Sequence, residues 1–191
     1  MSAAPRAATP GDWWVYHINS SNPLACDRWE YQGMKDGLHV SACRDLLNYY
    51  EGKDGNYAKT TDRDGRVRQE LTPFWPALSH PLWVGKSWRA RFNGLRTFQS
   101  ASNFRWASDV HVRVTAYEEI QVPAGTFKTF RIDLEDNGTP AGMSVAGGPA
   151  TTFVYHTTVW WAPEAGTFVK QVSSDGAWDA ELIGYLFRPQ K

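Results

Sequence analysis

The sequence predicts a mainly all-β protein: a strongly curved antiparallel sheet, a half-barrel or a sandwich of about eleven strands, with at most one or two short helices. Turn signals recur about every ten residues, and no segment shows the periodicity of an amphipathic helix. Ala-Gly-Thr-Phe follows a proline twice, at Ala124–Phe127 and Ala165–Phe168. Proline ends one strand, glycine makes the turn and Thr-Phe begins the next strand, so the second half of the chain repeats one strand-turn-strand pattern.

Length and composition favour one domain. We expect a flexible N-terminal lead-in over residues 1–11 and a single β domain over residues 12–191. The lead-in is rich in Ala and Pro and lacks the apolar centre of a signal peptide, so we interpret it as the remainder of a trimmed secretion signal. Lys+Arg and Asp+Glu are equal at 20 each, which argues against a nucleic-acid partner. No apolar run approaches the ~20 residues of a transmembrane segment.

The first strand is expected at Trp13–Ile18, where both faces are largely apolar. A hairpin then joins Cys26–Gln32 to Leu38–Arg44 through an Asp-Gly turn. The alternation of side chains places Cys26 and Cys43 on the polar faces of these strands, at similar distances from the turn. This arrangement favours a cross-strand disulfide and an extracytoplasmic location, and the alternative is two free thiols in a reducing compartment.

The middle of the chain contains two more turns and a break in the β pattern. Asp62-x-Asp64-Gly65 faintly resembles a calcium loop but lacks its remaining ligands, so we interpret it as a plain turn. Thr72–Pro81 contains three prolines and is expected to cross one end of the sheet. Phe74 and Trp75 would fill that end, or would form a lid over a cavity.

The second half continues the β pattern. We expect a strand from Leu82 to about Phe92, a loop at Asn93-Gly94 and a glycine-rich loop over Asn137–Pro149. Leu95–Ser108 is ambiguous, and a short helix is possible there or near residues 76–80. The other expected strands are Leu46–Glu51, Asn56–Thr60, Val67–Leu71, Val110–Val122, Phe127–Leu134, Ala150–Trp161, Phe168–Ser173 and Trp178–Phe187.

No pattern predicts a catalytic residue, a metal site or a cofactor. The five histidines show no metal-ligand spacing, although His111 and His156 lie on strands and could approach each other. Gly142–Ala146 is close to a nucleophile elbow but lacks the final glycine. The adjacent carboxylates Glu118-Glu119 and Glu135-Asp136 would point to opposite faces of a strand, so neither doublet is a ready glycosidase pair.

Aromatic residues are the most informative feature for function. They make up 14% of the chain, with ten tryptophans, and a core of this size could not bury all of them at the positions where they occur. On the concave side of a curved sheet they would suit an apolar ligand or a sugar ring. The candidate ligand-binding residues are Trp13, Trp75, Trp83, Trp160 and His156.

Three phrases, LWVGKSW at 82–88, VPAGTFKTFRI at 122–132 and WWAPEAGTFVKQ at 160–171, resemble a group of uncharacterised bacterial exported proteins. In that group a vGksW strand precedes a vPAGtF turn and a wyaPgvG-type turn. The resemblance implies a secreted or periplasmic protein, sometimes lipid-anchored, with a fold similar to the half-barrels of lipoprotein carriers around a hydrophobic hollow. The resemblance implies no catalytic residue.

The sequence therefore predicts a non-enzymatic, periplasmic or secreted bacterial protein. Its concave, aromatic-lined face would bind a hydrophobic small molecule, a lipid or a partner protein. Three alternatives stay open: a carbohydrate-binding module with coplanar exposed indoles, a structural subunit of a cell-surface assembly, and a hydrolase with convergent carboxylates or histidines. The identity of the ligand and the oligomeric state are not determined by the sequence.

Overall fold

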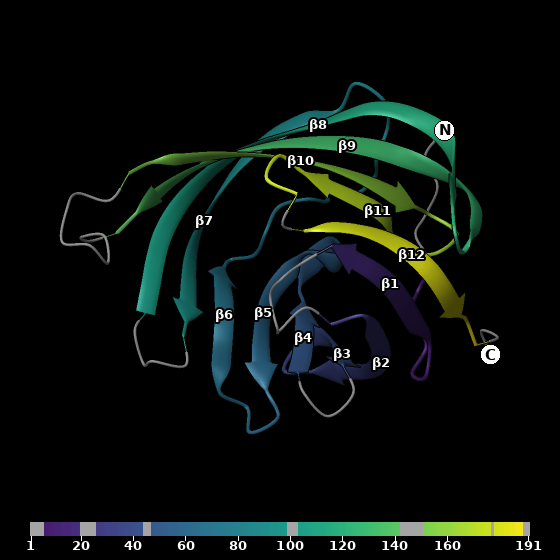
Figure 1. Ribbon diagram of the computed structural model, residues 1–191, viewed down its shortest axis with the longest axis horizontal. Coiled ribbons are helices and arrows are strands. Elements are labelled where there is room, and N and C mark those ends of the chain that lie inside the picture. Colours follow the sequence, from purple (N-terminus) through teal and green to yellow (C-terminus); the bar gives the residue numbers. More distant parts are fainter. Residues whose placement is uncertain are drawn as a thin grey trace.

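The chain folds into a closed antiparallel barrel of twelve strands (Figure 1). The computed structural model describes residues 6–19, 26–43, 47–98, 103–141, 151–176 and 178–188. Consecutive strands are neighbours throughout, and β1 closes the barrel by pairing with both β2 and β12. The strands are β1 Trp13–Asn19, β2 Arg28–Lys35, β3 Leu38–Cys43, β4 Leu47–Glu51, β5 Tyr57–Asp62, β6 Val67–Thr72, β7 Ser87–Thr97, β8 Asn103–Val122, β9 Gly125–Pro140, β10 Phe153–Ala162, β11 Thr167–Ser173 and β12 Asp179–Leu186.

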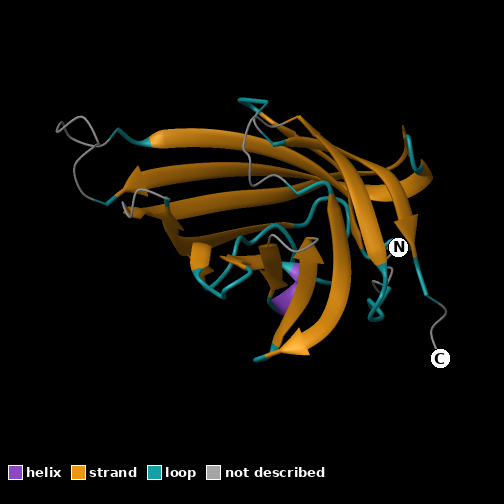
Figure 2. Cartoon of the chain, turned by 60° about the horizontal axis from the view of Figure 1, so that its bottom comes forward, coloured by secondary structure: helices purple, strands orange, loops and turns teal. Residues whose placement is uncertain are grey.

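The all-β prediction is confirmed, with two corrections. The sheet closes on itself instead of forming a half-barrel, and it has twelve strands instead of about eleven. Closure depends on the register of Trp14 with Tyr185 and with Trp29, which joins the two ends of the domain. The only helical turn among the described residues is the short 3₁₀ segment η1, Lys53–Gly55, and no described helix is long and apolar enough to span a membrane (Figure 2).

Long and short strands form opposite sides of the barrel. The strands β8 and β9 arch over the top of Figure 1, and the shorter strands β1 to β6 complete the wall below them. The inward face of β8 carries Val110, Val112 and Val114, all fully buried, as the alternation in the sequence predicts. These valines belong to the main core, which also contains Ile132 and Trp161 from β9 and β10.

Two glycines mark where the sequence-based boundaries are wrong. Asn93-Gly94 is not a loop, because β7 continues through it, and a Cβ on Gly94 would stand 2.2 Å from the ring of Trp106. Gly138 likewise lies in β9 under the ring of Phe153, 1.9 Å from where its Cβ would be. Each glycine is needed so that an aromatic ring on the neighbouring strand can cover the backbone. Residues 142–149 of the predicted glycine-rich loop lie outside the described residues and include the Gly142–Ala146 motif.

The proline-rich segment after β6 packs against the main core and contains no helix, and its predicted crossing of one end of the sheet stays a prediction. Asn56 binds both the amide nitrogen and the carbonyl oxygen of Leu78, each at 2.8 Å. The Trp75 amide donates to the carbonyl oxygen of Tyr57, and the Trp88 indole donates to that of Pro76. Leu78 is buried in the main core, so the segment is part of the interior packing.

A second core holds the chain ends against the tip of the β8–β9 hairpin. The Ala124 amide donates to the carbonyl oxygen of Leu182 on β12. The fully buried carboxylate of Asp12 accepts bonds from the Arg6 guanidinium and from the Arg188 amide. Burial acts to raise the pKa of Asp12, but these bonds and one from Thr9 outweigh it and hold the pKa below its usual value. Residues 6–12 are therefore bonded to the domain, while the assignment of residues 1–11 as a lead-in stays a prediction.

The predicted disulfide joins Cys26 to Cys43, with a Cα separation of 6.0 Å. Both residues are buried against Leu47 and Trp29. Cys43 shares the β3 face of His39 and Ser41, as the alternation predicts. Cys26 precedes β2, which frees it from the alternation of that strand. Disulfides persist in oxidising compartments, and the protein is accordingly periplasmic or secreted, as predicted.

Candidate functional site

The first part of the candidate site is a group of four aromatic side chains on the inward faces of β8 and β10. We call it the aromatic shelf; its members are Phe104, Trp106, Phe153 and Tyr155. Phe104 stacks on Trp106 with ring centroids 5.4 Å apart, and Phe153 lies 5.2 Å from Tyr155. The shelf continues the face of the buried valines, yet Phe104 and Tyr155 remain 36% and 42% exposed. Inward-facing aromatic surface that the core does not cover is what an apolar ligand requires.

A carboxyl group lies beside the shelf. Asp136 on β9 pairs in register with Val110 on one side and Tyr155 on the other, so it shares their inward face. Burial raises its pKa, and the nearby Ser108 hydroxyl only partly offsets this. Its Oδ1 atom is buried without a hydrogen-bond partner, and Asp136 forms no ion pair with the part of the chain that the structure describes.

The second part of the candidate site is a group of hydroxyl and carboxyl groups on the inward faces of β1, β4 and β5. We call it the Glu51 cluster; its members are Tyr16, Tyr49, Glu51 and Tyr57. Tyr49 stacks on Tyr57 with ring centroids 4.7 Å apart, and Trp29 extends this row at 5.2 Å from Tyr49. The Tyr16 hydroxyl donates past the intervening β12 to the Phe168 carbonyl oxygen of β11, at 2.9 Å. All four members are half-buried, so each keeps some accessible surface.

Electrostatics show how enclosed this cluster is. Burial raises the pKa of Glu51 to about 7 and that of Tyr57 to about 12. Burial also raises the pKa of Tyr16 and of Tyr49, and the Glu51 carboxylate raises both further by repelling a phenolate. The phenols are therefore neutral at physiological pH, while Glu51 can exist in either form. No ion pair of Glu51 occurs within the described ranges.

Arg96 connects the two parts. It pairs in register with Phe104 of the aromatic shelf, and its positive charge acts to lower the pKa of Tyr57 in the Glu51 cluster. Its guanidinium stands 5.3 Å from the Phe98 ring centroid. The shelf and the cluster thus border the same interior, and Arg96 lies between them.

The five residues predicted to bind ligand do not form one group. Trp75 packs against the main core, and Trp13 lies under the Arg28 guanidinium at 4.7 Å. Trp83 is 48% exposed in the turn before β7, with the Lys86 ammonium 4.7 Å from its ring. Their role as ligand contacts stays a prediction.

Trp160 and His156 do share one face of β10, but it is the face opposite the buried Val159. The Trp160 indole donates to Glu118 at 2.8 Å and is flanked by Arg131 and Lys170, which hold it as part of a surface network. His156 is exposed and pairs in register with Glu135, as His111 does from the other side. His111 and His156 are thus separated by β9. The described residues contain no cluster of side chains able to hold a metal ion.

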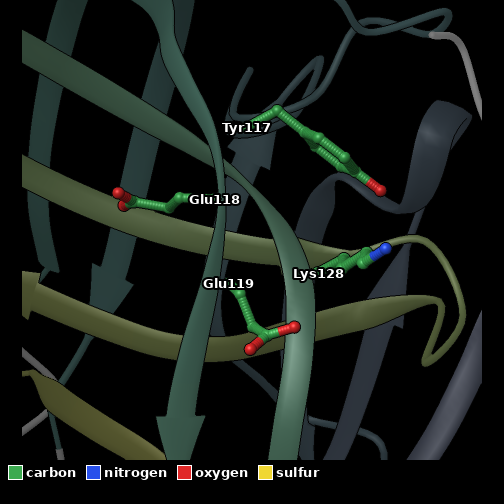
Figure 3. Close-up of a pocket in the computed structure, with 4 residues that line it drawn as sticks. All are labelled: Tyr117, Glu118, Glu119 and Lys128. Carbon is green, nitrogen blue, oxygen red and sulfur yellow. The ribbon is translucent and has the colours of Figure 1, made fainter.

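A shallow depression of about 200 Å³ lies near the tip of the β8–β9 hairpin (Figure 3). Its lining residues are Tyr117, Glu118, Glu119 and Lys128. Figure 3 shows Glu118 pointing away from Tyr117 and Lys128, and Glu118 is already bonded to Trp160. The depression therefore offers few convergent groups, and we do not favour it as the ligand site.

Sequence reasoning missed both parts of the candidate site, although local signals were present. The inward face of β8 can be followed back by steps of two from Val110 through Ser108 to Trp106 and Phe104. This extension falls within Leu95–Ser108, where the sequence pattern is ambiguous. Three members of the Glu51 cluster lie on the expected neighbouring strands Leu46–Glu51 and Asn56–Thr60, and only Tyr16 comes from a distant strand.

The comparisons with known proteins agree with the fold. No family model and no curated protein matches the chain. Among solved structures, the hypothetical lipoprotein YmcC from Escherichia coli is similar over 96% of this chain and 86% of its own, with 12% identity and a TM-score of 0.57. A lipoprotein candidate from Parabacteroides distasonis covers 97% of this chain and 100% of its own, with 10% identity and a TM-score of 0.55.

A third solved structure is an exported-protein candidate with a YmcC-like fold from Bacteroides fragilis. It is 12% identical over 96% of this chain and 99% of its own, with a TM-score of 0.51. Identities this low show a shared fold alone. They support the resemblance to uncharacterised exported proteins at the level of architecture, and the three sequence motifs remain untested.

Proposed function

We propose that this protein is a non-enzymatic, extracytoplasmic binding protein whose barrel interior holds a hydrophobic ligand. The observation that carries the proposal is the aromatic shelf, where inward-facing rings stay exposed beside a fully packed core. Covering exposed apolar area contributes about 25 cal/mol per Å², so an apolar ligand that lies on these rings would be bound favourably. The exported-protein neighbours support the location but say nothing about a ligand.

Absence of catalytic machinery is a second support, limited to the described residues. The inward carboxyls Glu51 and Asp136 come from strands on opposite sides of the barrel, and His39, the register neighbour of Glu51, is exposed and bonded through Nδ1 to the Tyr31 hydroxyl. The carbohydrate-binding, structural-subunit and hydrolase alternatives stay predictions. None of them has an observation as specific as the shelf in its favour.

The test is binding of N-phenyl-1-naphthylamine, a neutral apolar probe whose fluorescence rises in apolar surroundings. We expect saturable binding by the intact protein and at least a fivefold weaker affinity in Phe104→Ser and Tyr155→Ser, since each loses roughly 2 kcal/mol of apolar contact. Trp83→Ser is the matched control, because it removes an equally exposed aromatic ring outside the barrel interior. No saturable binding, or equal loss in the control, would reject the proposal.

A further inference from the structure

The interior of the barrel is unusual in having carboxyl groups without cationic partners. Glu51 and Asp136 both face inward and form no ion pair within the described ranges. An isolated carboxylate is costly to bury, and buried charges in proteins are normally paired. A positively charged group from outside the chain could pair with these carboxylates.

The surroundings of Glu51 define that partner more closely. Its direct register neighbour on β5 is Tyr57, which stacks on Tyr49, and Trp29 continues the row. Aromatic faces attract ammonium groups through their negative π-surface, and a carboxylate at the same place adds a full charge. Aromatic rings that surround one carboxylate are the arrangement that recognises a quaternary or protonated amine.

The other groups that face Glu51 do not supply that positive charge. Tyr16 from β1 and Tyr31 from β2 act on it through neutral phenols. His39, its register neighbour on β3, is exposed and is bonded through Nδ1 to the Tyr31 hydroxyl at 2.8 Å. Arg96 lies toward the aromatic shelf, and its electrostatic effect falls on Tyr57.

We propose that the ligand is an amphipathic amine: its ammonium group contacts Glu51, Tyr49 and Tyr57, and its apolar part lies on the aromatic shelf. This inference rests on the proposed function, because it assumes that the barrel interior holds the ligand. It adds the charge of the ligand and the orientation in which it binds. The half-buried state of every member of the Glu51 cluster leaves the surface that such a head group needs.

The experiment compares three probes with the same alkyl chain and different head groups: decyltrimethylammonium, 1-decanol and decyl sulfate, all below micellar concentrations. Each competes with bound N-phenyl-1-naphthylamine. We expect decyltrimethylammonium to bind about tenfold more tightly than the other two. Glu51→Gln should remove this preference while leaving the affinity for 1-decanol unchanged.

Two control positions distinguish a specific loss of the cation preference from a loss of folding. Glu119→Gln removes an exposed carboxylate outside the cluster and should keep the preference. Tyr49→Phe keeps the ring and should retain cation binding, whereas Tyr49→Leu should lose it at an unchanged affinity for 1-decanol. The cation preference should also grow between pH 5 and pH 8 in the intact protein, because the carboxylate form is required, and should stay constant in Glu51→Gln.

The outcomes distinguish the two proposals. If N-phenyl-1-naphthylamine binds but the three head groups compete equally, or if decyl sulfate binds most tightly, the amine assignment is overturned and the proposed function stands. If the preference survives in Glu51→Gln, Glu51 is not the contact and the assignment is also overturned. If no probe binds, both proposals fail.

Discussion

The interior side chains of this barrel are packed differently on its two sides. In the centre of β8 to β10 the inward positions are apolar and sealed, and Val110, Val112 and Val114 have no exposed surface. On β1, β4 and β5 the four members of the Glu51 cluster are all half-buried. The segment after β6 packs against the main core and is also bonded to Asn56, just before β5. The comparison teaches that the centre of the long side is packed for stability, whereas the short side keeps accessible surface around Glu51.

A substitution in the sealed side should produce the largest effect on stability. Trp161 is 2% exposed and packs with His80 at 4.7 Å between ring centroids. Trp161→Ala should lower the free energy of unfolding by about 3–5 kcal/mol, because a large cavity replaces buried contacts. Urea unfolding followed by circular dichroism measures this. A cost below that of Tyr49→Ala would show that the two sides do not differ as described.

Removal of the disulfide should cause the second-largest loss of stability. It closes a loop of sequence separation 17, so a Cys26→Ser/Cys43→Ser double variant should lose roughly 3 kcal/mol, through a less restricted unfolded chain. The measurement is urea unfolding with and without reductant. Reductant should destabilise the intact protein by the same amount and leave the variant unaffected. An intact protein insensitive to reductant would argue against the bond.

The glycines under aromatic rings should give an intermediate effect. Gly94→Ala places a methyl group where the Trp106 ring lies, and we expect a loss of about 1–3 kcal/mol together with displacement of that ring. Gly184→Ala is the matched control, since its Cβ would meet only Trp13, at an ordinary 3.8 Å. Thermal unfolding gives the stability, and probe binding reports the shelf. Equal effects at both glycines would contradict the proposed ring-over-glycine packing.

The smallest effect concerns the pH dependence of the accessible side. The pKa of Glu51 is about 7 in the folded protein and 4.5 in its unperturbed state, so the folded chain binds the extra proton between these values. The free energy of unfolding should therefore fall as the pH rises from about 4.5 to about 7. Because Glu51 is half-buried, we expect roughly 1–2 kcal/mol.

Glu51→Gln should remove this decline, and Glu119→Gln should keep it. Urea unfolding at several pH values between 4 and 8 provides the measurement. A decline of the same size in Glu51→Gln would assign it to another group, with Asp136 as the next candidate, since burial raises its pKa as well.

Much of the fold could be predicted because β structure leaves local signals. The Asp36-Gly37 hairpin occurs as expected, with Lys35 opposite Leu38 and positive φ at both turn residues. The alternation through Val110 to Val114 gave the buried face of β8 correctly. The candidate site could not be predicted in the same way, because the pattern of Leu95–Ser108 is ambiguous and only the curved sheet brings Tyr16 of β1 near the β4–β5 hairpin.

The amino-acid sequence by itself indicated most of the strands and turns and the buried face of the long hairpin, and it favoured the pairing of Cys26 with Cys43. These depend on side-chain alternation and on turn residues, which act over a few positions. Only the tertiary structure decided that β1 closes the sheet, that Gly94 continues a strand and that Tyr16 of β1 lies near Tyr49 and Glu51 of β4. Register and closure are set by contacts between distant segments, so no local pattern contains them.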